Sequence, residues 1–274
     1  SWRGQPVALK ALKEGFQPGA NECSDFMREC EIGVRLQHRN VVGVHGLLSR
    51  GEEHPVIVQE LMSGGTVEEV LTRRQAQKGC PWPPQREQLL GWCQDLARAL
   101  AYLHSQDRKV LHRDIKPANL MLTQGEKTLK LGDFGLSRAV DGGSSAEPYS
   151  MSGQVGTIRF MAPEVFSSNA HYTEKVDVYS AAMCFYTMAT GEKPFAEYTD
   201  MGLGGKVANG LRPSIVAVEW KPLASLIQRA WAVKPEDRPS AAEMLAELTA
   251  MEKELREDSS DPVRPRPSRS SSGA

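Results

Sequence analysis

The sequence predicts an α+β domain in which a few strands precede a larger, mainly helical part. Two apolar runs near the start, residues 5–13 and 54–66, have the composition of strands, and the second ends in a glycine-rich bend. Two later runs, residues 87–107 and 175–190, carry apolar residues at helical spacing or nearly all round. The chain of 274 residues is 40% hydrophobic and 24% charged, which is ordinary for a globular domain with a sizeable core.

Composition excludes several classes of protein. The formal net charge of −1 gives no reason to expect a nucleic-acid partner. No apolar run approaches the roughly 18 residues of a membrane span, and the start has no signal-peptide pattern. The cysteines are odd in number and form no C-x-x-C pair, so we expect reduced thiols and a cytoplasmic location, with the nucleus as an alternative. They are Cys23, Cys30, Cys80, Cys93 and Cys184.

Charged residues are concentrated within the segment VLHRDIKPANLML, residues 110–122, between two apolar runs. Buried charges need partners or a function, although a polar loop between two strands is the simpler alternative. Asp114 and Asn119 lie five positions apart, Pro117 stiffens the turn between them, and Lys116 stands beside the acid. An acid, a cation and an amide at this spacing suit a site that handles a phosphate group.

A second carboxylate follows at the end of the next predicted strand. The segment LKLGDFG, residues 129–135, places Asp133 directly after that strand. An Asp-x-Gly sequence is common in turns, so the tripeptide alone is weak evidence. Its position 19 residues after Asp114 is more informative, because a strand, a turn and a second strand separate the two acids. A second carboxylate could hold the metal ions that a site handling phosphate needs for charge neutralisation.

Together these segments resemble the H-R-D-x-K-P-x-N loop and the D-F-G segment of protein kinases. Further matches are V-A-L-K at residues 7–10, a helical pattern at 22–36, GTIRFMAPE at 156–164 and AWAVKPEDRPS at 230–240. The resemblance runs from about residue 5 to 250 and takes the form typical of the tyrosine-kinase-like serine/threonine group.

This resemblance implies the two-lobed protein-kinase fold. Residues 1–61 are expected to form the small antiparallel β lobe with the helix called αC in kinases. Residues 62–253 are expected to form the large, mainly α-helical lobe. Residues 254–274 are rich in Pro, Ser and Arg and are expected to be a disordered tail.

The implied activity is transfer of the γ-phosphate of ATP to Ser or Thr hydroxyls of protein substrates. Asp114 would orient the acceptor hydroxyl, and Lys116 would neutralise the transferring phosphoryl group. Asn119 and Asp133 would hold Mg²⁺. A lysine two places after the catalytic aspartate is the serine/threonine form of this loop.

The nucleotide is expected to lie between the lobes. Lys10, paired with Glu29 of the 22–36 helix, would orient the α- and β-phosphates. The adenine would contact side chains of both lobes and the hinge backbone, with Gln59 at the gatekeeper position. The residues expected around the adenine are Ala8, Gln59, Glu60, Leu61, Met62 and Met121.

Other matched residues are expected to support the site without touching substrate. Asp177 would brace the backbone of the catalytic loop, and Arg238 would form a partly buried ion pair with Glu164. His112 would pack under Phe134 rather than act as a base. In the same family pattern, the hydroxyl of Thr157 would bridge Asp114 and Lys116.

Residues 136–155 are rich in Ser and Gly and match the activation loop. An upstream kinase acting there could order the loop through a contact between a new phosphate and Arg113. A passive loop without a regulatory site is the alternative. The candidate hydroxyls are those of Ser144, Ser145, Tyr149, Ser150 and Ser152.

Several departures from the family pattern weaken the expectation of full activity. The G-x-G-x-x-G loop that precedes the V-A-I-K strand is absent, so the small lobe is expected to be truncated at its N-terminus. Gly33 stands where a larger apolar residue is usual, which predicts a loosely docked αC helix. The alternative to an enzyme is therefore a pseudokinase scaffold. The proline-rich stretch near residues 72–86 is expected to be a surface loop.

Overall fold

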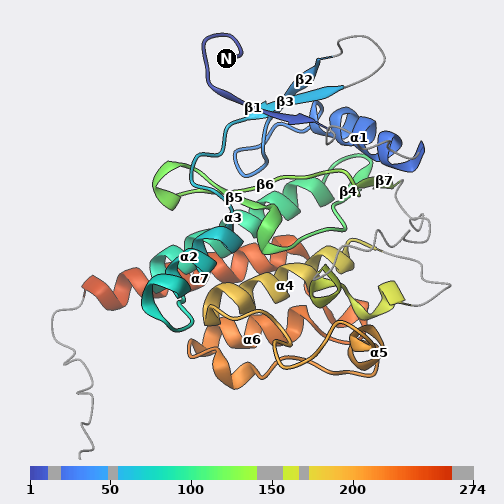
Figure 1. Cartoon of the computed structure of the whole chain (residues 1–274). Helices are drawn as coiled ribbons and strands as arrows, with labels where there is room; N and C mark the ends of the chain where they lie inside the picture. Colours follow the sequence, from blue (N-terminus) through green and yellow to red (C-terminus); the bar gives the residue numbers. More distant parts are fainter. Residues whose placement is uncertain (12–19, 49–54, 141–156, 167–172, 261–274) are drawn as a thin grey trace, which may run out of the picture.

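The computed structural model has two lobes, a small one built on a sheet and a large helical one (Figure 1). Strands β1 (Val7–Ala11), β3 (Val56–Glu60) and β2 (Val44–Leu48) lie in that order in an antiparallel sheet. Helix α1 (Ala20–Gly33) lies beside the sheet. The structure describes residues 1–11, 20–48, 55–140, 157–166 and 173–260.

The register of the small sheet explains which side chains face α1. Lys10 pairs with Ile57, so both side chains lie on the same face. Ile57 is fully buried and packs with Phe26 and Cys30 of α1. Alternation along β1 therefore turns Ala8 and Lys10 inward and leaves Leu9 on the outer face, 62% exposed.

The large lobe is built around two buried helices, α3 (Arg86–His104) and α4 (Lys175–Thr190). Trp92, Leu96 and Leu100 of α3 are fully buried, and α4 is apolar nearly all round, as the sequence predicts for a central helix. The surrounding helices are α2 (Val67–Lys78), α5 (Leu203–Ala208), α6 (Lys221–Ala230) and α7 (Ala241–Ser260).

Two short antiparallel pairs carry the polar segments to the interface between the lobes. Strand β4 (Lys109–Leu111) pairs with β7 (Arg138–Val140), and β5 (Leu120–Leu122) pairs with β6 (Leu129–Leu131). The loop after β4 holds Asp114, and the turn after β6 holds Asp133. Both predicted catalytic segments therefore begin at the end of a buried strand.

The prediction of a surface loop over residues 72–86 is wrong for its first half, because α2 continues to Lys78. Thr66 begins this helix with a capping box: its hydroxyl accepts from the Glu69 N–H, and the Glu69 carboxylate accepts from the Thr66 N–H. The helix ends at Gly79, which has a left-handed conformation. The proline cluster that suggested a loop begins only beyond this point.

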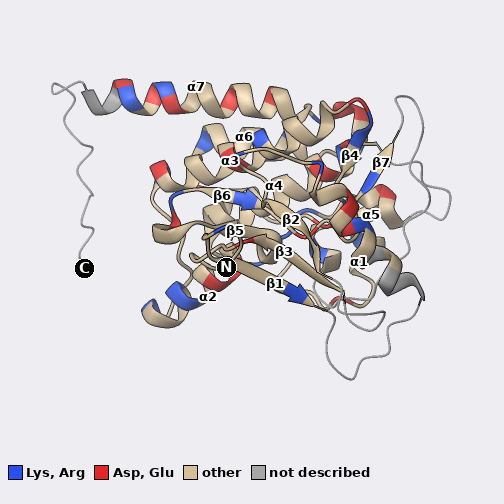
Figure 2. Ribbon diagram, turned by 90° about the horizontal axis from the view of Figure 1, so that it is seen from above, with Lys and Arg blue, Asp and Glu red and all other residues tan. Residues whose placement is uncertain are grey.

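The prediction of disorder from residue 254 is also wrong for residues 254–260, which continue α7. Ser240 and Glu243 cap the start of this helix, and Leu255 packs against the core near its end. Figure 2 shows α7 running along the side of the large lobe, with charged residues over its last turns. Residues 261–274 lie outside the described part of the chain. No described helix is long and apolar enough to cross a membrane.

Candidate active site

Lys10, Glu29 and Asp133 meet between the lobes, as the sequence predicts for the first two. The Lys10 Nζ atom lies 2.7 Å from the Glu29 carboxylate and 2.9 Å from Asp133 Oδ1. Burial alone would raise the pKa of Asp133, but Lys10 holds it below its ordinary value. Burial would lower the pKa of Lys10, and the two carboxylates raise it above its ordinary value. Lys10 is therefore a fixed cation in the cleft.

The catalytic loop gathers an acid, a cation and an amide, as its spacing predicts. The Asn119 amide donates to the Asp114 carbonyl at 2.7 Å and to Asp114 Oδ2 at 3.0 Å. Lys116 Nζ lies 2.9 Å from the same Oδ2 and donates to the Thr157 hydroxyl at 3.1 Å. The predicted contact of Thr157 with Lys116 is thus present.

The second carboxylate oxygen of Asp114 has a different environment. Oδ1 is buried and has no hydrogen-bond partner among the described residues. Lys116 and Asn119 fix the carboxylate through Oδ2 and leave Oδ1 as an acceptor. A cavity of about 840 Å³ lies beside this loop and is lined in part by Lys116, Pro117 and Thr157. A hydroxyl donor that reached Oδ1 would satisfy a buried acceptor that otherwise costs free energy.

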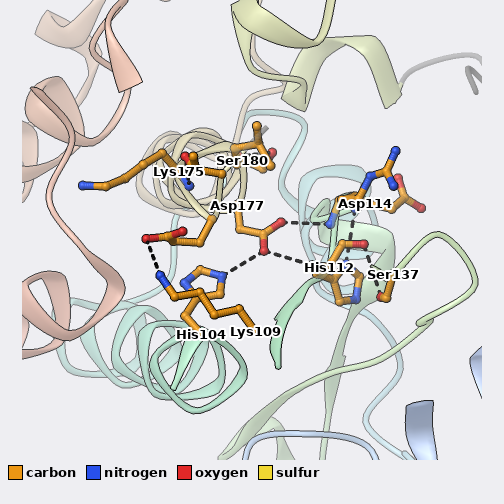
Figure 3. Close-up of polar contacts among 12 residues, drawn as sticks. His104, Lys109, His112, Asp114, Ser137, Lys175, Asp177 and Ser180 are labelled. Carbon is orange, nitrogen blue, oxygen red and sulfur yellow. Dashed lines mark hydrogen bonds and ion pairs between the residues drawn. The ribbon is translucent and has the colours of Figure 1, made fainter. Parts of the chain in front are cut away.

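Asp177 braces the backbone of this loop from α4 (Figure 3). Its carboxylate accepts from the N–H groups of His112 and Arg113, both at 2.9 Å. Arg113 has a left-handed backbone with φ of +70°, an unusual conformation for a residue other than glycine. Asp177 therefore braces the loop backbone, as predicted, and it does so at a strained residue immediately before Asp114.

Sequence reasoning missed a further partner of Asp177. His104, the last residue of α3, places Nε2 2.9 Å from Asp177 Oδ2. Burial would raise the pKa of Asp177, but the hydrogen bond and charge of His104, the charge of His112 and the Arg113 N–H lower it below its ordinary value. A histidine after a run of helical residues gives no spacing signal, so only the fold reveals this contact.

His112 packs against Phe134, which supports its predicted structural role. The two rings meet edge to face with centroids 5.0 Å apart, and both side chains are almost fully buried. The His112 Nε2 atom lies 3.0 Å from the Gly132 carbonyl oxygen. The catalytic loop and the segment that carries Asp133 are therefore packed as one unit.

Glu164 and Arg238 form the predicted ion pair in the large lobe. Two N–H groups of Arg238 meet the two carboxylate oxygens of Glu164 at 2.7 and 2.8 Å. The Arg238 side chain has no exposed surface, and its guanidinium lies over the ring of Tyr179. This pair fixes the segment that follows Thr157.

The space at Gly33 is filled, contrary to the packing gap on which the predicted loose docking of α1 was based. A methyl group placed on Gly33 would lie 2.5 Å from Val44 Cγ2, so the side chain of Val44 already fills the space at Gly33. The Lys10–Glu29 pair is formed, which requires α1 to lie close to β1. Gly33 is therefore not a packing defect. It allows α1 to approach β2 closely at Val44.

Comparison with known proteins agrees with this geometry. Residues 1–248 match the family described as protein kinase domain. The chain belongs to the protein kinase family. Serine/threonine-protein kinase VIK of Arabidopsis thaliana is 34% identical, with 94% of this chain and 57% of the relative covered. Mitogen-activated protein kinase kinase kinase 7 of Homo sapiens is 32% identical, with 90% and 38% covered.

A third relative of this kinase domain is serine/threonine-protein kinase TNNI3K of Mus musculus, 31% identical over 90% of this chain and 28% of the relative. These relatives are serine/threonine kinases of the tyrosine-kinase-like type. The chain spans less than two thirds of the length of each of them.

The residues that the kinase family uses for Mg²⁺ have suitable chemistry here. Asp133 and Asn119 offer a carboxylate and an amide oxygen, which are hard ligands of the kind Mg²⁺ prefers. The Asp133 side chain is 39% exposed, so it is accessible from the cleft. The Gly132 N–H donates to the Asn119 carbonyl at 3.0 Å, which keeps the two ligand-bearing segments together.

The residues expected around adenine come from both lobes of the kinase. Ala8 and Gln59 are register partners on β1 and β3, and Met121 lies on β5. Glu60 ends β3, and the chain then passes into the large lobe through two further residues of the predicted set, Leu61 and Met62.

Two predictions concern residues beyond the described ranges. The candidate phosphorylation sites between residues 144 and 152 fall in the segment 141–156, which the structure does not describe. Residues 138–140 form β7, so the start of the predicted activation loop is a strand paired with β4. The expected truncation of the small lobe at its N-terminus also stays a prediction.

Proposed function

We propose that this domain is an active serine/threonine protein kinase that transfers the γ-phosphoryl group of ATP to a Ser or Thr hydroxyl. The observation that carries the proposal is the hydrogen bonding of the two carboxylate oxygens of Asp114. One carboxylate oxygen is fixed by Lys116 and Asn119, and the other is a buried acceptor without a partner among the described residues. An acceptor hydroxyl that donates to Oδ1 would be oriented for attack and would pass its proton to this oxygen.

The cations of the site suit the charge that develops during transfer. Lys116 lies beside Asp114 and would neutralise the transferring phosphoryl group. Lys10, held by Glu29, would pair with the α- and β-phosphates. Bound Mg²⁺ would supply further neutralisation of phosphate charge at Asn119 and Asp133. The protein therefore contributes position and electrostatics, and no covalent intermediate is needed.

Asp177 contributes to the same reaction by fixing the loop. Its bonds to the N–H groups of His112 and Arg113 keep the left-handed conformation that precedes Asp114. Because the carboxylate is completely buried, it is not screened by water. The position of Asp114 is set before the acceptor arrives, which lowers the ordering cost of the reaction.

The partners proposed for the domain follow from this activity. They are protein substrates with Ser or Thr acceptors and an upstream kinase acting on residues 136–155. We also propose a cytoplasmic or nuclear location, because the cysteines among the described side chains carry free thiols. These are Cys30, Cys80, Cys93 and Cys184.

Phosphate transfer to peptide libraries tests the proposal. The chain would be incubated with Mg²⁺ and ATP, and with separate libraries that present Ser/Thr or Tyr as the acceptor. We expect phosphate on the Ser/Thr library, dependence on Mg²⁺, and transfer by Asp114→Asn that is lower by a factor on the order of 100 or more. Binding of ATP without transfer to either library would instead identify a pseudokinase scaffold.

A further inference from the structure

An ion pair joins the end of β3 in the small lobe to β6 in the large lobe. Lys130 Nζ lies 2.6 Å from Glu60 Oε1, between residues that are 70 positions apart in the sequence. The Lys130 side chain is 16% exposed and that of Glu60 is 33% exposed. Glu60 ends the strand that leads to the hinge, and β6 leads to Asp133. The pair therefore connects the strand that leads to the hinge with the strand that leads to the predicted metal ligand Asp133.

The same two elements hold the segment of residues 40–43 between them. The Leu131 N–H donates to the Asn40 carbonyl, and the Val42 N–H donates to the Leu131 carbonyl, both at 2.9 Å. The Glu60 N–H donates to the Gly43 carbonyl at 2.8 Å, and Glu60 Oε2 accepts from the Gly43 N–H at 3.2 Å. The Glu60–Lys130 pair thus closes a ring that contains β3, this segment and β6.

Lys130 also lies beside the side chain expected under the adenine. Met121 and Lys130 are register partners on β5 and β6, so their side chains lie on the same face of this hairpin. A methyl group placed on Gly132 would lie 3.3 Å from Met121 Sδ and 3.1 Å from Val42 Cγ2. The end of Met121 and the side chain of Val42, in the segment that the ring holds, therefore both lie beside Gly132.

We propose that Glu60 and Lys130 form a positioning pair for nucleotide binding, which holds the hinge backbone in fixed relation to Met121. The proposal rests on the proposed function, because it assumes that a nucleotide occupies this cleft. The Lys130 side chain is committed to the protein ion pair and is assigned no nucleotide contact. Without the pair, the hinge and the floor of the adenine site are connected within this ring only through the hydrogen bonds of residues 40–43. Their relative position is then less fixed, and nucleotide binding must order it.

This arrangement predicts a larger effect on nucleotide affinity than on turnover. The pair acts at the adenine side, whereas Asp114 is held separately by Lys116, Asn119 and the brace from Asp177. Loss of the ion pair should therefore raise the dissociation constant for ADP and the KM for ATP more than it lowers kcat. A purely structural role would lower the melting temperature and leave nucleotide affinity unchanged.

Four variants test the pair. Lys130→Met keeps most of the aliphatic stem, and Glu60→Gln keeps an acceptor for the Gly43 N–H. The double variant combines them, and Lys130→Arg retains the charge. We expect each single neutral variant to raise the ADP dissociation constant about tenfold, which is about 1.4 kcal/mol. The ADP dissociation constant of the double variant should not exceed the larger of the two single-variant values. That of Lys130→Arg should remain within about twofold of the value for the unaltered chain.

The matched control is Arg229→Met, which removes an exposed ion pair with Glu247 in the large lobe. Its ADP affinity should equal that of the unaltered chain. If the unaltered chain binds ADP, two results would overturn the inference. One is an unchanged ADP affinity in Lys130→Met, and the other is a double variant whose fold-change in ADP affinity is the product of the two single fold-changes. Failure of the unaltered chain to bind ADP would overturn the proposed function and this inference with it.

Discussion

The Glu164–Arg238 pair makes a strong prediction about stability. Removing the carboxylate in Glu164→Ala leaves the Arg238 guanidinium without its counter-charge in a site where its side chain has no exposed surface. Breaking a buried pair in this way costs about 3–5 kcal/mol. Arg238 keeps its hydrogen bonds to the carbonyls of Ala232 and Lys175 and its position over Tyr179. We therefore expect the lower end, about 3 kcal/mol.

Thermal unfolding would measure this cost. For a domain of this size, each kcal/mol shifts the melting temperature by about 2–4 °C, so Glu164→Ala should melt about 6–12 °C lower. The control is Glu247→Ala, which breaks the exposed pair with Arg229, where both partners are more than a third accessible. Such a pair contributes about 0–1 kcal/mol. A melting temperature for Glu164→Ala that matched the control would refute the reasoning.

Three further predictions concern the cleft, α1 and the brace. Lys10→Met removes the cation that pairs with Glu29. Its kcat/KM for ATP should be lower than that of the unaltered chain by a factor on the order of 100. Gly33→Ala should lower the free energy of unfolding by about 1–3 kcal/mol, because its methyl group would overlap Val44, and Val44→Ala in the same chain should restore part of it in urea titrations. The folded pKa of Asp177 lies below its ordinary value of 3.8. The contribution of this carboxylate to the free energy of unfolding is therefore complete above about pH 4 and is lost as pH falls through the folded pKa. In urea titrations between about pH 3 and 6, the free energy of unfolding of Asp177→Asn should depend less on pH than that of the unaltered chain.

Sequence patterns predicted those parts of the site that lie in contiguous motifs. Asp114, Lys116 and Asn119 occur within six residues, so their spacing alone brings an acid, a cation and an amide together. The Lys10–Glu29 and Glu164–Arg238 pairs join distant segments, and their prediction depended on resemblance to the kinase family. The structure confirms the geometry of these contacts.

Contacts between segments without a motif could not be predicted in this way. His104 reaches Asp177 only because α3 and α4 pack side by side, and Lys130 reaches Glu60 only because β6 lies below the small sheet. The volume at Gly33 is filled by Val44 from a neighbouring strand, which a helical pattern does not indicate. Such contacts depend on tertiary packing.

Errors in element boundaries have a local physical cause. Prolines near residue 81 suggested a loop that began too early, whereas the capping box at Thr66 and the left-handed Gly79 fix the two ends of α2. At the end of α7, the Pro-, Ser- and Arg-rich composition of residues 254–274 suggested a disordered tail that began too early. Leu255 still packs against the core there and continues the helix.

The most direct test of the central claim compares nucleotide binding with phosphate transfer in Asp114→Asn. This change keeps the size of the side chain and removes the carboxylate that we propose orients the acceptor hydroxyl. We predict that Asp114→Asn binds ATP with Mg²⁺ about as tightly as the unaltered chain and that transfer to a Ser/Thr peptide falls by a factor on the order of 100 or more. Equal transfer by both proteins would contradict the role assigned to Asp114 and with it the proposed catalytic site.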